Sequence, residues 1–186
     1  MVQDCLQKER SALMVVDVQE RLVDHVERRC DMLAAIKKMV KGAQILDLPI
    51  WVTEQYPEGL GVTEPRLREC LGAKQAYCRK TTFSALADPV IRQKIEADGR
   101  EQWILVGIEA HVCILQTARD LIAAGKQVTV LNDCISSRSL YDYSTAIAEL
   151  RDLGVRISTA ETVLFELLHD SKAPEFKQIS ELIKCC

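Results

Sequence analysis

The sequence of 186 residues contains little of what marks a protein that binds nucleic acid or a membrane. Its 24 lysines and arginines are outnumbered by 27 acidic residues, and a formal net charge of −3 offers no basic surface for a phosphate backbone. No stretch approaches the roughly eighteen apolar residues of a membrane span. The first ten residues mix both charge signs without an apolar run, so no signal peptide is expected. We therefore predict a cytoplasmic protein in a reducing compartment, with no nucleic-acid and no membrane partner.

The sequence also lacks the glycines that a nucleotide-binding turn would need and the clustered histidines that a metal site would need. The turn that follows the first predicted strand, residues 17–22, has no glycine, and no GxxxxGK[ST] motif occurs. The three histidines form no HxxxH or DxH cluster that could bind a metal; they are His25, His111 and His169. We therefore expect no nucleotide, no metal and no other cofactor.

Eight cysteines are present, but they show neither CxxC spacing nor histidine partners at zinc-finger distances. A chain of this length can bury a substantial core without disulfides, so reduced thiols in an intracellular protein are the simpler interpretation. Any one cysteine is then most often a small buried hydrophobe. A reactive cysteine therefore has to be identified by its position in the fold and not by its residue type.

Short apolar runs alternate with amphipathic stretches along the whole chain. The runs predicted to be strands are residues 11–17, 50–53, 76–80, 102–106, 127–131 and 155–158. The helices predicted around them cover residues 29–47, 89–98, 113–124, 140–153, 161–168 and 174–183. This alternation predicts one α/β domain, residues 1–186, with a six-stranded parallel sheet in a three-layer α/β/α sandwich. Right-handed crossovers leave few strand orders, of which the Rossmann-like 3-2-1-4-5-6 is a common one.

Two chemically different side chains are predicted to meet at the carboxyl edge of this sheet. Asp17 ends the first strand, and a turn from Gly107 to Cys113 leaves the fourth. Ligands of doubly wound sheets bind at the switch point between these two strands. Cys113 lies at a predicted helix start, where exposed N–H groups and the helix dipole favour a thiolate. We therefore predict Cys113 as a nucleophile and Asp17 as its base.

A cation is expected beside this pair. Lys80 ends the third predicted strand and could stabilise both the Asp17 carboxylate and a Cys113 thiolate. The opposing interpretation is that Asp17 caps a turn and Lys80 is a solvated charge. His111 offers a competing Cys–His pair, but residues i and i+2 do not share a helix face. We expect His111 to line the pocket.

Three stretches in this chain resemble the isochorismatase-like cysteine hydrolase family, which includes nicotinamidases, carbamoylsarcosine amidohydrolases and isochorismatases. The matching stretches follow one another in the family order and are Met14–Gln19, Arg79–Ala85 and Gly107–Cys113. The resemblance covers nearly the whole chain and implies the isochorismatase-like form of the predicted sheet. It also implies a homo-oligomer, a dimer or a larger assembly.

The resemblance further implies a catalytic triad of Asp17, Lys80 and Cys113. It implies a cis peptide between Ile108 and Glu109, with the backbone N–H groups of Glu109 and Cys113 as an oxyanion hole. The implied reaction is attack on a carbonyl, loss of an amine or other leaving group, and hydrolysis of a thioester.

Two departures from the family pattern narrow the choice of substrate. Nicotinamidases carry an Asp-x-His metal cluster after the second strand, whereas residues 53–61 of this chain contain no histidine. Isochorismatases proper typically lack the cysteine, so Cys113 argues against a vinyl ether substrate. The segment resembles the isochorismatase-domain branch of the family instead. The residues predicted to wall the substrate pocket are Gln19, Tyr56, Phe83 and His111.

The sequence therefore predicts a metal-independent cysteine hydrolase that cleaves a C–N bond of a small amide. Two alternatives remain open. The same fold could serve as a binding or assembly protein that retains the triad with little turnover, and rapid alkylation of Cys113 would argue against this. A ligand-binding domain of flavodoxin type is the second alternative, and the absorbance of a bound flavin would reveal it.

Overall fold

The computed structural model describes residues 5–184, in which six parallel strands form one sheet. The strand order is β3-β2-β1-β4-β5-β6, and this confirms the predicted order and the α/β class. The strands are β1 Ser11–Val16, β2 Ile50–Gln55, β3 Tyr77–Lys80, β4 Gln102–Ile108, β5 Gln127–Ser136 and β6 Arg156–Ser158. The predicted domain, 1–186, extends beyond the described range at both ends, and the terminal Cys185–Cys186 pair lies outside it.

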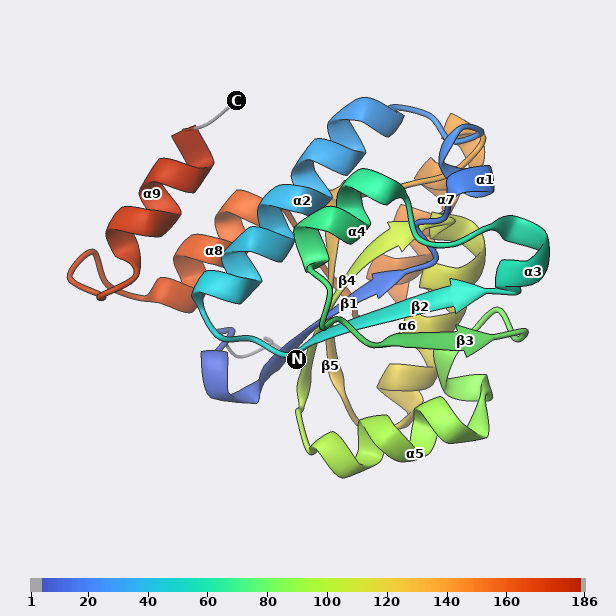
Figure 1. The fold of residues 1–186 in the computed structure, drawn as a ribbon. Coiled ribbons are helices and arrows are strands. Elements are labelled where there is room, and N and C mark those ends of the chain that lie inside the picture. The colour runs from blue at the N-terminus through green and yellow to red at the C-terminus, as the bar shows by residue number, and fades with distance from the viewer. Residues whose placement is uncertain (1–4, 185–186) are drawn as a thin grey trace.

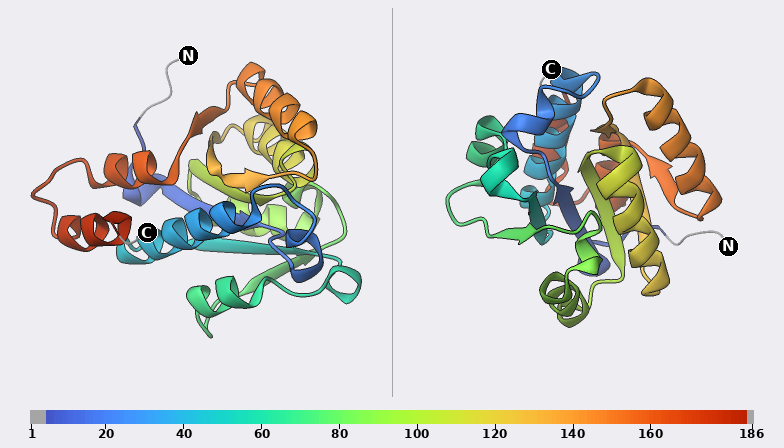
Figure 2. Two further views of the ribbon diagram at one scale, coloured as in Figure 1. Left: turned by 90° about the horizontal axis from the view of Figure 1, so that it is seen from above. Right: turned by 90° about the vertical axis from the view of Figure 1, so that its right-hand side faces the viewer.

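Helices cover both faces of the sheet (Figures 1 and 2). One face carries α2, α4, α8 and α9, and the other carries α5, α6 and α7. The α-helices are α1 Glu20–Val23, α2 Arg29–Ile45, α3 Pro57–Leu60, α4 Pro65–Leu71, α5 Pro89–Asp98, α6 Leu115–Ala123, α7 Leu140–Asp152, α8 Ala160–Leu168 and α9 Phe176–Lys184. Short 3₁₀ turns lie at η1 Lys8–Arg10 and η2 Ala85–Ala87, and a π-helical turn lies at η3 Ala110–Ile114.

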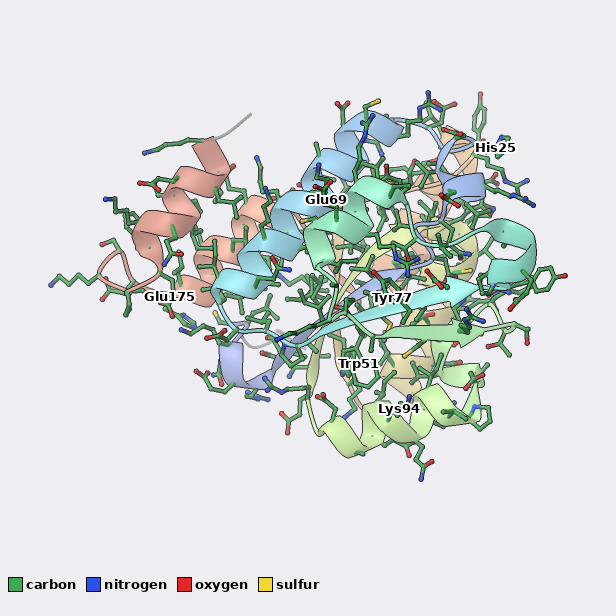
Figure 3. All side chains as sticks on the ribbon, in the orientation of Figure 1. His25, Trp51, Glu69, Tyr77, Lys94 and Glu175 are labelled. Carbon is green, nitrogen blue, oxygen red and sulfur yellow. The ribbon has the colours of Figure 1, made fainter. Side chains whose placement is uncertain are left out.

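Strand β1 shows why the sheet is covered on both sides. All six of its residues are buried, and Leu13 and Val15 pack into the core under α2 while Met14 and Val16 pack into the core under α5 and α6. Side chains alternate between the faces of a strand, so a continuous apolar run needs an apolar layer on each side. Trp51 of β2 and Tyr77 of β3 likewise pack on opposite faces of the sheet (Figure 3).

Two differences from the expected elements bear on the site. The turn-rich segment expected over residues 54–65 contains α3 and the start of α4, because Pro57 and Pro65 occupy first helical positions. The Glu64 side chain accepts a hydrogen bond from the Leu67 N–H at 2.8 Å and caps α4. The helix expected to begin at Cys113 begins at Leu115, after the η3 turn. Cys113 therefore lies inside a π-helical turn.

The carboxyl ends of the strands point to one side of the molecule, where α1 and α3 lie (Figure 1). The segment that follows β1 pairs there with the segment before α4: Gln19 and Thr63 form an antiparallel bridge. The Glu64 N–H donates to the Val18 carbonyl at 2.8 Å. This pairing fastens the α3 region over the sheet edge that carries the predicted site. Within residues 5–184, no helix has both the length and the apolarity of a membrane span.

Candidate active site

The strand ends bring the predicted site residues together. Asp17 follows β1 in the left-handed region, with φ of 52°, and its N–H donates to the Thr53 carbonyl at 3.2 Å. Lys80 is the last residue of β3, and its Nζ lies 2.6 Å from Asp17 Oδ2. Both side chains are completely buried. An ion pair without access to water retains much more of its Coulomb attraction than a surface pair.

Lys80 is surrounded by hydrogen-bond acceptors. Besides Asp17, its Nζ donates to Gln55 Oε1 at 2.8 Å and to the main-chain carbonyls of Thr82 and Phe83 at 3.1 Å each. An ammonium group has three donors and no acceptor. All four neighbours accept, so the geometry fits a charged Lys80 and leaves a neutral amine no partner for its lone pair.

Cys113 is buried, with 7% of its surface exposed, and its thiol donates a hydrogen bond to the Asp17 carboxylate. The pKa of the Cys113 thiol is raised to about 12: burial is the largest cause and the Asp17 carboxylate adds to it, while Lys80 and a hydrogen bond from the Glu109 backbone partly oppose them. The predicted helix start favours a lowered pKa for this thiol, and the direction found is the opposite. The favourable effect of a helix start is outweighed by desolvation and by a carboxylate that holds the proton on sulfur.

The turn between β4 and η3 brings Cys113 to this edge. The Ile108–Glu109 peptide bond is cis, and Gly107 has φ of 126°. A Cβ atom at Gly107 would lie 2.1 Å from the Val16 carbonyl oxygen, so β1 and β4 could not approach as they do with any other residue there. The Glu109 carboxylate accepts from Arg138 Nε at 2.7 Å. The backbone N–H of Glu109 forms a hydrogen bond with the Cys113 sulfur, which lowers the pKa of the thiol.

The sequence predicted Gln19 as a wall of the substrate pocket, but the structure does not place it there. Its side chain is completely buried and bonds to main-chain groups: Nε2 donates to the carbonyls of Gln55 and Gly61, at 2.9 and 2.6 Å. Its Oε1 accepts from the Gln55 N–H at 2.7 Å. These bonds occupy the amide, so Gln19 ties the end of β2 to the segment beyond α3.

The two aromatic residues predicted to line the pocket, Tyr56 and Phe83, contact Lys80 with their main-chain atoms. The Tyr56 N–H donates to the Lys80 carbonyl at 2.9 Å, and the Phe83 carbonyl accepts from Lys80 Nζ. Each side chain is 54% exposed. His111 is partly buried, and its Nδ1 lies 3.0 Å from Ser137 Oγ in the connection between β5 and α7. Tyr56 and Phe83 are thus placed where they can meet a ligand at this edge.

Sequence reasoning missed two polar residues of β2. Thr53 Oγ1 donates to Asp17 Oδ1 at 2.7 Å, and Gln55 contacts Lys80. Together with Glu54 they are buried, although they follow the apolar start of the strand. Three polar residues at the end of a predicted buried strand were the available signal, because in a parallel sheet that end faces the ligand crevice. Among the described residues, no group of three or more histidine, cysteine or acidic side chains is arranged to hold a metal.

These features define a class: a doubly wound α/β domain with a carboxylate, an ammonium and a thiol at its switch point. The family model described as the isochorismatase domain matches residues 11–162, a range that includes all three groups. The chain belongs to the isochorismatase family, which confirms the resemblance seen in its motifs.

Relatives from animals carry the same domain. The protein named isochorismatase domain-containing protein 2A from Mus musculus is 40% identical over 180 residues, which cover 95% of this chain and 84% of that protein. Isochorismatase domain-containing protein 1 from Danio rerio is 38% identical over 174 residues, and the match spans 94% of this chain but only 61% of that protein. A solved structure described as MAR1 ribonuclease from Caenorhabditis elegans is 36% identical, with a TM-score of 0.91 over 97% of this chain and 92% of its own.

Proposed function

We propose that the protein is a cysteine hydrolase that cleaves the C–N bond of a small amide. Cys113 is the nucleophile, Asp17 is the base and then the acid, and Lys80 is a fixed cation. The observation that carries the proposal is the buried chain of contacts from the Cys113 thiol to the Asp17 carboxylate and from there to Lys80 at 2.6 Å. A nucleophile, a base and a group that orients the base are the parts that covalent catalysis requires.

In the first half of the reaction the thiol proton moves to Asp17 as the sulfur attacks the carbonyl carbon. An S–C bond forms, and the carbonyl π electrons move to oxygen and produce an oxyanion. The oxyanion then collapses, the C–N bond breaks, and the departing nitrogen takes the proton from Asp17. A thioester on Cys113 and a free amine result. Because the pKa of the thiol is raised to about 12, the transfer is concerted with attack and does not begin from a resting thiolate.

In the second half, water attacks the thioester and gives a proton to Asp17. The S–C bond breaks, the carboxylic acid leaves, and the proton returns to the sulfur. The proposed oxyanion donors are the backbone N–H groups of Glu109 and Cys113, of which the Glu109 group is supported by its hydrogen bond toward the sulfur. Lys80 stays charged throughout and balances the Asp17 carboxylate whenever that group is ionised.

Mass spectrometry of the enzyme during turnover tests the proposal. The protein is incubated with a panel of small primary amides and N-carbamoyl compounds, quenched in acid and digested. We expect an acyl adduct on the peptide that contains Cys113, and release of amine or ammonia. Cys113→Ala should abolish both, while Cys134→Ala, at another buried cysteine, should abolish neither.

Three other outcomes would overturn the proposal. Specific binding of an amide without adduct or amine release would favour a binding or assembly protein. The Caenorhabditis elegans structure is described as a ribonuclease, so RNA belongs in the same panel. Cleavage of RNA that survives Cys113→Ala would place the chemistry outside the triad. Cleavage of RNA lost in that variant would give the triad a different substrate class.

A further inference from the structure

Gln55 lies beside the buried Asp17–Lys80 ion pair but is not one of its two charged groups. It is the last residue of β2, and β2 lies between β1, which leads to Asp17, and β3, which ends at Lys80. Its Oε1 accepts from Lys80 Nζ at 2.8 Å, and its Nε2 donates to the Thr81 carbonyl at 2.7 Å. Both ends of the amide are therefore used at the carboxyl end of β3.

The main chain of Gln55 is held as firmly as its side chain. Gln19 accepts from the Gln55 N–H at 2.7 Å and donates to the Gln55 carbonyl at 2.9 Å, so one buried amide bonds to both main-chain polar groups of the residue. Gln55 also pairs with Lys80 in the β2–β3 register. A side chain fixed at its backbone and at both amide atoms can hold an ammonium group in one orientation.

The acceptors around Lys80 compete for its protons. Asp17, Gln55 and the carbonyls of Thr82 and Phe83 are four acceptors for three N–H groups. The carbonyls of Thr82 and Phe83 lie on the chain after β3, whereas Gln55 ends β2 and Asp17 directly follows β1. Without the Gln55 oxygen, the ammonium has only carbonyls to balance its bond to Asp17, and we expect it to shift toward them.

We propose that Gln55 is a positioning residue that holds the Lys80 ammonium against Asp17, so that the cation acts on Cys113. This inference rests on the proposed function, because it assigns Gln55 a role in the same triad. Gln55 acts through Lys80 and touches no reacting atom. Its substitution should therefore lower kcat and leave KM nearly unchanged.

The test compares Gln55→Met with Gln75→Met as a matched control. Gln75 lies just before β3 and its Nε2 donates to the carbonyls of Ile50 and Ala76, so the control also removes an amide with two main-chain partners. We expect Gln55→Met to lower kcat by about 10- to 100-fold, the effect of a slightly displaced catalytic group. We also expect its Cys113 alkylation profile to move to higher pH, because the Lys80 charge that lowers the pKa of this thiol has moved away. Gln75→Met should change neither.

Gln55→Glu keeps the inference testable if Gln55→Met folds poorly. It retains an oxygen for the ammonium but buries a new carboxylate, so a purely structural role predicts that Glu is worse than Met. A positioning role predicts the reverse order in kcat for the folded protein. An unmoved alkylation profile in Gln55→Met, with kcat falling only in proportion to the folded fraction, would overturn the inference.

Lys80→Met separates this inference from the function on which it rests. Alkylation needs no turnover, so the profile can be measured whatever the substrate is. If Lys80→Met leaves the profile of Cys113 unchanged, the triad itself is uncoupled and the proposed function fails. If Lys80→Met moves the profile and Gln55→Met does not, the triad stands and only the role of Gln55 is refuted.

Discussion

At the scale of single residues, Asp17 affects Cys113 in two opposing ways. Its charge and its hydrogen bond raise the pKa of the thiol, yet the same carboxylate is the proposed acceptor of the thiol proton. We predict that Asp17→Asn makes Cys113 more reactive toward iodoacetamide between pH 8 and 9, by about tenfold for each unit by which the pKa falls. The same variant should lose about 10²- to 10⁴-fold in amide hydrolysis, because the base is gone.

Peptide mass spectrometry of alkylated protein, measured across pH beside the rate of amine release, checks this prediction. Lys80→Met is the control of opposite sign, because Lys80 lowers the pKa of the thiol and its removal should slow alkylation. If Cys113 is alkylated more slowly in Asp17→Asn than in the wild type, the carboxylate activates the resting thiol. That result would contradict the raised pKa described above.

The Asp17–Lys80 pair also has a consequence for stability. Removing one partner leaves the other charge buried and unpaired, so Lys80→Met should lower the free energy of unfolding by about 3–5 kcal/mol. The double variant Asp17→Leu, Lys80→Met has no unpaired charge and should recover much of that loss. Chemical denaturation of the two variants and the wild type measures both values. Equal stability of the single and double variants would contradict a charge-based cost.

At the scale of elements, the parallel pairing of β1 with β4 depends on Gly107. Alanine there would place Cβ 2.1 Å from a main-chain oxygen of β1 and would require φ of 126° from an L-residue with a side chain. We predict that Gly107→Ala lowers the free energy of unfolding by about 3 kcal/mol or more. Gly125→Ala is the control: its φ is 76°, but nothing lies within 4 Å of the added Cβ, so only about 1 kcal/mol of backbone strain is expected.

Thermal or chemical unfolding of the two glycine variants gives the comparison. A residual activity assay on the folded fraction of Gly107→Ala adds a second measurement, because the displaced strand also carries the turn to Cys113. Equal losses at Gly107 and Gly125 would mean that left-handed strain, and not the contact with β1, accounts for the cost.

Elements with local boundary signals could be predicted from the sequence. Helix α5 begins at Pro89. Its N-cap is Asp88, whose side chain accepts from two N–H groups, and its C-cap is Gly99, with φ of 77°. Helices α3 and α4 carry the same proline signal, but their nearby glycines favour a loop equally well. A turn of four residues such as Pro57–Leu60 is held by its tertiary contacts and not by its own propensity.

The meeting of Asp17, Lys80 and Cys113 was predictable because the ends of parallel strands converge at one edge. The environment of each of these three side chains could not be predicted from the sequence. The use of Gln19 by main-chain groups depends on the tertiary path of the chain after α3, and no sequence spacing encodes it. The raised pKa of Cys113 depends on how completely neighbouring elements exclude water, which a helix-start argument leaves out.

At the scale of the whole molecule, we propose a homo-oligomer. Large apolar side chains remain exposed at the start of α7, where Leu140 is 55% and the neighbouring Tyr141 85% exposed. Contiguous exposed apolar patches mark surfaces between protein chains, and we propose this adjacent pair as part of such a contact. We predict a solution mass of at least twice the 20.9 kDa of one chain. Light scattering coupled to size exclusion measures it, and a mass of one chain at all concentrations would contradict the proposal.

Lys80 belongs to the outermost strand of the sheet. β3 has four residues and pairs only with β2, whereas β1 at the centre is paired on both sides. Short edge elements open at a lower free energy than central ones. The amides of β3 should therefore exchange with deuterium before those of β1, and amide hydrolysis should disappear in urea while the circular dichroism is still native. The working lifetime of this protein is then limited by the detachment of one strand, and a variant that fastens β3 would extend it without changing the core.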